Sequence, residues 1–170
     1  MKPTPLKLWV LLALLISGCG YHLVGTGTSL PDHLRTLYIP IFKNTSSQPD
    51  IHRDLTSSVI NSFITDGRVK IAPREKADME LKAELFFYEL RAVSFSSNDF
   101  VSDYIVELGV NLKVIDNVKG KTYMEDKFNT QWDYKASSDI VDTESARLAA
   151  LELAYKELGN RLVGLVIDQF

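Results

Sequence analysis

Two long stretches of the chain repeat apolar residues at the spacing of an α-helix. In residues 51–66 every fourth position is apolar, which places one apolar face along a helix, and Asp66-Gly67 is a typical C-terminal stop. The second stretch runs from about Thr143 to Ile167, with Asp142 as its candidate N-cap. Its apolar positions step by three and four residues and define one face: Leu148, Leu151, Tyr155, Leu158, Leu162 and Leu165.

Three segments between these helices alternate apolar and polar residues, which is typical of β-strands. The clearest begins at Tyr104 and stays apolar at alternate positions up to Val114. The segment before it, 79–95, changes phase after Phe87, which predicts a β-bulge. The segment after it, 122–134, places one set of residues on a single side: Met124, Phe128, Thr130, Trp132 and Tyr134. Polar turns separate the three segments, so a β-meander is the simplest connection.

A further β-rich segment, 36–42, precedes the first helix and contains Pro40. Because proline cannot donate a hydrogen bond to a neighbouring strand, Pro40 indicates an edge position or a bulge. The element order is therefore strand, helix, three or four strands, helix. This order predicts an α+β fold, a two-layer sandwich in which two helices pack on one face of a mostly antiparallel β-sheet.

The amino terminus has the order of properties of an export signal. Lys2 and Lys7 precede an unbroken apolar run over residues 8–16, and small residues lead to Cys19. The run is well short of the about 20 apolar residues that a transmembrane helix needs. Ile16-Ser17-Gly18-Cys19 resembles the lipobox of bacterial lipoproteins, with isoleucine in place of the usual leucine. The resemblance implies cleavage before Cys19, acylation of its sulfur and, because Gly20 follows, sorting to the outer membrane.

Composition indicates a packed domain with a slightly acidic surface. The chain has 170 residues, 45% of them hydrophobic, and a formal net charge of −3. Removing residues 1–18 takes away two lysines and no acidic residue, which leaves 17 basic and 22 acidic residues and a net charge of −5. A chain of this charge is not typical of nucleic-acid-binding proteins. Its single cysteine cannot form an internal disulfide, so stability must come from the core.

The sequence offers no catalytic or metal-binding motif. It contains no Gly-x-Ser-x-Gly, no His-Glu-x-x-His and no phosphate loop, and its three histidines, at 22, 33 and 52, have no partner at metal-ligand spacing. We therefore expect a protein that is not an enzyme and uses no metal or cofactor. A lipid-anchored hydrolase stays open as an alternative, but the sequence names no residue for it.

Five residues of the predicted sheet are candidates for contacts with an anionic glycolipid or a protein partner. Phe95 and Phe100 flank one turn, and aromatic residues near an exposed turn are typical of protein interfaces. Lys119 and Lys121 flank Gly120 at the next turn, where contact with a phosphate is the alternative to a solvated turn. Arg91 is the remaining basic candidate.

The mature amino terminus resembles the LptE family of lipopolysaccharide-assembly lipoproteins. The resemblance is specific from Cys19 to about Asp66 and is carried first by the motif Cys19, Gly20, Tyr21, His22 and Leu23. It continues in these residues: Gly25, Leu30-Pro31, Leu37-Tyr38-Ile39-Pro40 and Phe42-Lys43-Asn44. Family members bind lipopolysaccharide through basic residues at the tip of the first meander hairpin and the start of the last helix. In this chain those places hold residues that are not basic: Ser96, Ser97, Asn98 and Asp142. The family's lipopolysaccharide-binding residues are therefore not assigned to this chain.

The resemblance implies an outer-membrane subunit of the lipopolysaccharide translocon. Such a protein plugs the β-barrel LptD, assists the assembly of that barrel and serves the insertion of lipopolysaccharide at the cell surface. We expect residues 1–18 to be a signal peptide, 19–31 a lipidated tether and 32–170 a single domain facing the periplasm and the barrel lumen. An auxiliary lipoprotein of another envelope transporter is the principal alternative.

Overall fold

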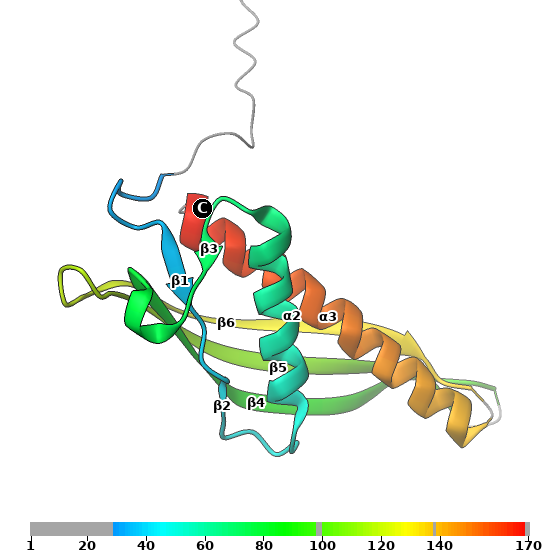
Figure 1. Cartoon of the computed structure of the whole chain (residues 1–170). Helices are drawn as coiled ribbons and strands as arrows, with labels where there is room; N and C mark the ends of the chain where they lie inside the picture. Colours follow the sequence, from blue (N-terminus) through cyan, green and yellow to red (C-terminus); the bar gives the residue numbers. More distant parts are fainter. Residues whose placement is uncertain (1–28, 98–99, 138, 169–170) are drawn as a thin grey trace, which may run out of the picture.

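The computed structural model describes residues 29–97, 100–137 and 139–168 (Figure 1). These residues form a six-stranded mixed sheet and two α-helices, α2 (Ile51–Asp66) and α3 (Ile140–Asp168). The strand order is β3-β1-β4-β5-β6, with β2 beside β4. The remaining elements are β1 (Thr36–Tyr38), β2 (Lys43–Asn44), β3 (Lys70–Ile71), the 3-10 turn η1 (Arg74–Lys76), β4 (Met79–Phe95), β5 (Val101–Asp116) and β6 (Lys121–Lys135). The predicted α+β class is confirmed.

Pro40 interrupts the first extended segment, as its chemistry predicts. β1 pairs in parallel with the beginning of β4, and β2 pairs in parallel further along the same strand, opposite Glu84 and Leu85. The connection between them carries Pro40, whose missing N–H would leave a gap in a continuous ladder. The two short strands thus follow one side of β4 in succession.

The three long strands form the predicted antiparallel meander, and β4 contains the predicted bulge. Leu85 lies opposite Val110 and Phe87 opposite Gly109, so Phe86 is the extra residue. After the bulge, Tyr88 lies opposite Leu108 and the alternation resumes in the opposite phase. The phase change in the sequence thus marks a bulge that keeps apolar side chains on the same face of the sheet.

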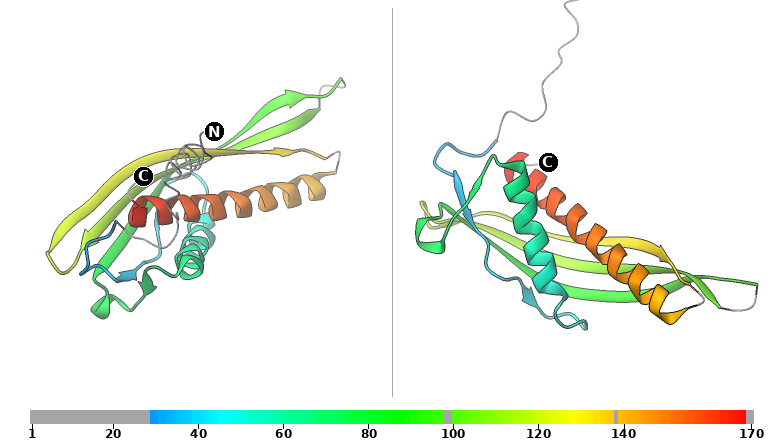
Figure 2. Two further views of the ribbon diagram at one scale, coloured as in Figure 1. Left: turned by 90° about the horizontal axis from the view of Figure 1, so that it is seen from above. Right: turned by 45° about the vertical axis from the view of Figure 1, so that its right-hand side comes forward.

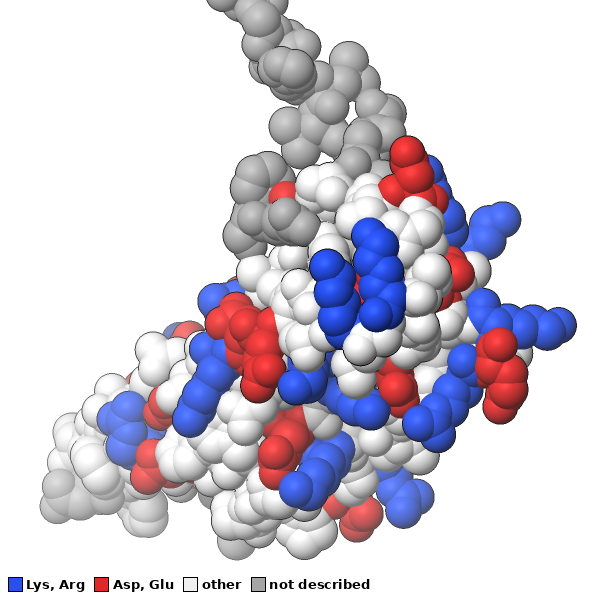
Figure 3. Space-filling model, turned by 90° about the vertical axis from the view of Figure 1, so that its left-hand side faces the viewer, with Lys and Arg blue, Asp and Glu red and all other residues white. Residues whose placement is uncertain are grey.

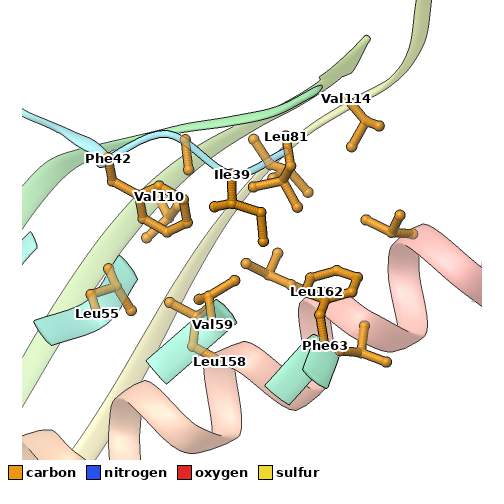
Figure 4. Packing of buried hydrophobic residues seen from close by; sticks show 14 of the residues in the cluster. Ile39, Phe42, Leu55, Val59, Phe63, Leu81, Val110, Val114, Leu158 and Leu162 are labelled. Carbon is orange, nitrogen blue, oxygen red and sulfur yellow. The ribbon is translucent and has the colours of Figure 1, made fainter. Parts of the chain in front are cut away.

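Both helices cover one face of the sheet, and the core lies between the two layers (Figure 2). The sheet, both helices and the β1–β2 connection all contribute to it (Figure 4). The labelled residues are Ile39, Phe42, Leu55, Val59, Phe63, Leu81, Val110, Val114, Leu158 and Leu162. The apolar period of each helix therefore identified its buried face.

The start of α3 differs from the sequence prediction. The helix begins at Ile140, because the Asp139 carboxylate accepts a hydrogen bond from the Val141 N–H at 2.7 Å and caps the first turn. Asp142, the predicted cap, lies inside that first turn. Leu148, predicted on the buried face, is exposed, and the buried side of α3 begins at Ala150.

The two helices approach each other closely where α3 has a glycine. A Cβ atom on Gly159 would overlap the side chain of Ser62 in α2 and lie 3.3 Å from the Val59 Cα. Small residues at such a crossing let two backbones come together. Gly159 lowers the helix propensity of α3, but it permits the contact that joins the helices into one layer.

Candidate functional surfaces at the two ends of the domain

The amino-terminal segment is fixed to the carboxyl end of α3. Both the N–H and the hydroxyl of Ser29 donate hydrogen bonds to the Ile167 carbonyl, at 3.1 and 2.7 Å. Leu30, which the sequence prediction placed in the tether, is already buried in the core. Figure 1 shows this start of the described chain beside the end of α3. The point at which the chain enters the domain is therefore defined by the fold.

An ion-pair network holds together the elements at this end. The Arg68 guanidinium bonds to Asp66 at the end of α2 and to Asp168 at the end of α3. The hydrogen bonds that Arg68 donates to Asp66 and Asp168 raise the pKa of Arg68 above its usual value, and the bond from Arg68 lowers the pKa of Asp66. All three side chains are partly shielded from solvent. The network ties the two helix termini to each other.

Asp116 accepts a hydrogen bond from His33, for which the sequence predicted no partner. The His33 Nε2 lies 2.8 Å from the Asp116 Oδ2, and the Lys119 N–H donates to the Oδ1 at 2.8 Å. Asp116 is only 1% exposed. Burial opposes its ionisation, but the bonds from His33 and Lys119 outweigh that effect and lower the pKa of Asp116.

Asp78 completes the same cluster from the beginning of β4. Its Oδ2 accepts hydrogen bonds from the backbone N–H groups of Arg35 and Thr36, at 3.0 and 2.9 Å, and from the Thr36 hydroxyl at 2.7 Å. These bonds prevail over desolvation and lower the pKa of Asp78. We call the end formed by residues 29–36, β3, η1, the 117–120 turn and the end of α3 the tether-proximal end.

The structure separates the five predicted contact residues into two groups. Lys119 and Lys121 lie at the tether-proximal end, where both are exposed and form no ion pair with any other residue that the structure describes. Figure 3 views the molecule from this side and shows Lys and Arg side chains among acidic ones. Arg91, Phe95 and Phe100 lie toward the opposite end of the meander. The five residues therefore do not form one site.

The opposite end, which we call the distal end, exposes large apolar side chains. Phe95 and Phe100 are 64% and 74% exposed at the β4–β5 hairpin. Ile140 and Val141 in the first turn of α3 are 87% and 72% exposed at the same end of the molecule. The second pair was not predicted, because the apolar pattern of the sequence placed the helix start at about Thr143. Ser137 and Asp139, which precede Ile140 as capping residues, were the signal that would have found it.

Arg147 fastens α3 to the sheet beside the distal end. Its guanidinium donates to the Glu144 carboxylate at 2.8 Å and to the Tyr88 hydroxyl of β4 at 3.2 Å. Tyr104 and Tyr134 stack nearby in the sheet with ring centroids 5.4 Å apart, and burial raises the pKa of Tyr134 to about 12. The bond from Arg147 to Tyr88 therefore joins α3 to β4.

The helix-free face of the sheet carries charged side chains around a stack of Lys127 and Phe86 on Gly109. The Phe86 ring lies over Gly109, where a Cβ atom would overlap it, and the Lys127 ammonium lies 4.2 Å from the centre of that ring. A hollow of about 910 Å³ adjoins this stack, and its lysines alternate with acidic residues. Lys43 pairs with Glu84 and Lys113 with Glu125, at 3.2 and 3.3 Å. This balance of charge does not point to an anionic ligand.

Among the described residues, no group of side chains forms the catalytic arrangement that a hydrolase would need. His33 and Asp116 form an acid–histidine pair, but no hydroxyl among the described residues is hydrogen-bonded to His33. Within the same residues, no three metal-ligating side chains gather. No helix in this part of the chain has the length and apolar character to span a membrane. Cys19 and the Gly20–Leu23 motif lie outside the described residues.

The comparisons with known proteins match the chain to one family and to solved structures of similar fold. The family model described as "LptE: Lipopolysaccharide-assembly" matches residues 34–164. No curated protein sequence matches the chain significantly. Rare lipoprotein B from Shewanella oneidensis is similar in structure, with a TM-score of 0.53, 18% identity, and 74% of this chain and 92% of that chain covered. Lipoprotein B from Nitrosomonas europaea gives a TM-score of 0.54, 13% identity, and 81% and 86% coverage. At these identities the two structures support the fold alone.

Proposed function

The chain belongs to the LptE family of lipopolysaccharide-assembly proteins, and from this premise we propose that it is the outer-membrane lipoprotein subunit that binds and plugs an LptD-type β-barrel. In this role it assists the assembly of the barrel and the insertion of lipopolysaccharide at the cell surface. The match of the family model to residues 34–164 carries the proposal.

The exposed apolar distal end supports a protein partner. Phe95 and Phe100 flank a hairpin, and exposed aromatic side chains of this kind are enriched where proteins bind one another. A surface that leaves such side chains in water gains free energy when a partner covers them. We infer that the distal end is the part of the domain that enters the barrel lumen.

Acylation of Cys19 would attach this domain to the outer membrane. We propose that residues 1–18 are removed and that the acyl chains on the new amino-terminal cysteine form the anchor. Two or more acyl chains give stable attachment, whereas a single chain binds only marginally. The protein would then act without chemistry of its own, through its docking surfaces.

Co-purification from detergent-solubilised outer membrane tests the proposal. The wild-type protein should bring down an LptD-type barrel, and the double variant Phe95→Asp/Phe100→Asp should bring down at least about tenfold less, because two aromatic contacts are lost and charges are placed in the interface. Val118→Asp is the matched control, since Val118 is also exposed (59%) but lies at the tether-proximal end. Wild-type protein without any bound barrel would refute the proposal.

Protease protection separates a plug from an auxiliary subunit of another transporter. In intact outer membrane, the 96–97 turn of a plugging domain should be shielded by the barrel and become cleavable when the barrel is depleted. A domain docked to a periplasmic complex should be cleaved at the same rate in both cases. Equal cleavage would therefore favour the auxiliary lipoprotein.

A further inference from the structure

We propose that the tether-proximal end is a contact surface for anionic phospholipid headgroups, formed by Lys70, Lys76, Lys119 and Lys121. The inference rests on the proposed acylation of Cys19, which would bring this end of the domain to a bilayer. It adds a membrane-facing side to a protein whose opposite end is proposed to meet the barrel.

The position of the chain entry defines which end is near the bilayer. Only nine residues lie between Cys19 and Ser29, so the tether spans at most about 35 Å. Ser29 is bonded to the Ile167 carbonyl, which fixes the entry point beside β1 and the end of α3. The distal end lies about 50 Å away along the 16 residues of β5. An anchored domain therefore presents its tether-proximal end to the headgroups more readily than its distal end.

Hydrogen bonds join the elements that carry the four lysines. Lys70 in β3 donates its N–H to the Arg35 carbonyl, and Lys76 in η1 lies two residues before Asp78, whose carboxylate accepts from the Arg35 and Thr36 N–H groups. The Asn117 N–H donates to the Asp78 carbonyl at 2.8 Å, which brings the turn with Lys119 against the beginning of β4. Lys121 follows that turn, opposite Asp116. All four lysines therefore belong to one end of the domain.

The charges at this end lie at different depths. All four lysines are exposed, and none forms an ion pair with a described residue. Most acidic groups are buried or paired: Asp116 and Glu80 are 1% and 7% exposed, and Asp66 and Asp168 share Arg68. Asp32 is exposed, but it pairs with Arg35. Glu75 is the exposed acidic residue of η1. The outer surface is therefore more positive than the net charge of the chain suggests.

The arrangement fits a charged plane better than a small soluble anion. The hollow between η1 and the 117–120 turn has a volume of about 450 Å³, but Glu75, Asp78 and Glu80 line it together with Arg74 and Lys76. These carboxylates repel a phosphate from the hollow. Lysines spread over several elements can instead contact many phosphates of a bilayer surface, each adding about fivefold to binding.

The test places a fluorophore at each end of the acylated protein. The chain has one cysteine, which the anchor consumes, so Val118→Cys and, in a second protein, Ser96→Cys can be labelled selectively. Each protein is reconstituted in vesicles that contain a headgroup-attached quencher, made of phosphatidylcholine with or without about one third phosphatidylglycerol. The label at 118 should be quenched about threefold more with phosphatidylglycerol, and the label at 96 should not respond. Salt at about 0.5 M should abolish the difference by screening.

Charge variants of equal size identify the residues. Lys119→Gln/Lys121→Gln should remove most of the response at 118, whereas Lys135→Gln/Lys156→Gln, which neutralises two exposed lysines elsewhere, should preserve it. The inference would be overturned if quenching at 118 did not depend on phosphatidylglycerol, or if both double variants lost the response equally. Neither outcome would affect barrel co-purification. Mass spectrometry of Cys19 tests the anchor separately, and an unacylated cysteine would overturn both the anchor and this inference.

Discussion

Asp116 lies where the amino-terminal segment, β5 and the following turn meet. Its carboxylate is almost fully buried and takes hydrogen bonds from His33 and from the Lys119 N–H. A buried carboxylate without such bonds would be strongly unfavourable, so these two contacts decide whether this position is tolerated. Because His33 precedes β1, the pair also holds the entry of the chain against the sheet.

We predict that Asp116→Asn lowers the free energy of unfolding at pH 7 by about 2 kcal/mol, since hydrogen bonds to a charged acceptor are lost. The folded pKa of Asp116 is lowered, so its contribution is present above the unfolded pKa of about 3.9 and is lost as the pH falls through the folded value. The difference from wild type should therefore shrink below about pH 4. Urea unfolding followed by circular dichroism measures it, with exposed Asp133→Asn as the control. A difference that does not change with pH would contradict the role of the carboxylate.

At the scale of elements, the two helices approach closely at a point where the residues that face each other are small. Gly159 in α3 meets Ser62 in α2, whereas Gly164, one and a half turns later, has no other side chain or backbone within 4 Å of a Cβ placed there. From the sequence alone, both glycines are expected to weaken the helix. Their surroundings give them opposite effects.

We predict that Gly159→Ala lowers the free energy of unfolding by about 1 kcal/mol, because the overlap with Ser62 outweighs the gain in helix propensity. Gly164→Ala should raise it by up to about 1 kcal/mol, since only the propensity changes. Urea unfolding of both variants gives the comparison. Equal stabilisation by the two substitutions would show that the helices can move apart at no cost.

At the scale of the whole molecule, packing is uneven from one end to the other. The buried residues of α3 begin at Ala150, and the first turns of this helix expose Ile140, Val141 and Leu148. The tether-proximal end has the reverse character, with chain entry, helix termini and buried carboxylates joined by polar contacts. The domain is thus firm near its proposed anchor and loosely covered where we propose that a partner binds.

We predict that amide hydrogen exchange follows this gradient. Residues 140–149 should exchange at least about tenfold faster than residues 150–167, because few apolar contacts oppose their local opening. Leu158→Ala, which removes a buried side chain, should lower protection over the second range by about 2–5 kcal/mol, whereas exposed Leu148→Ala should not. Exchange measured by mass spectrometry would contradict the gradient if both ranges opened together.

The sequence by itself determined the elements and their buried faces, because the period of apolar residues is a local property of each helix or strand. Pro40 and the phase change after Phe87 were sufficient to predict a broken edge and a bulge, and Cys19 with its surroundings was sufficient to predict an anchor. Only the tertiary structure decided which of these residues meet. His33 and Asp116 are 83 positions apart, and Gly159 of α3 lies against Ser62 of α2. Strand register, the approach of the helices and the capping of α3 by Asp139 set those distances, and they depend on residues that no local pattern connects.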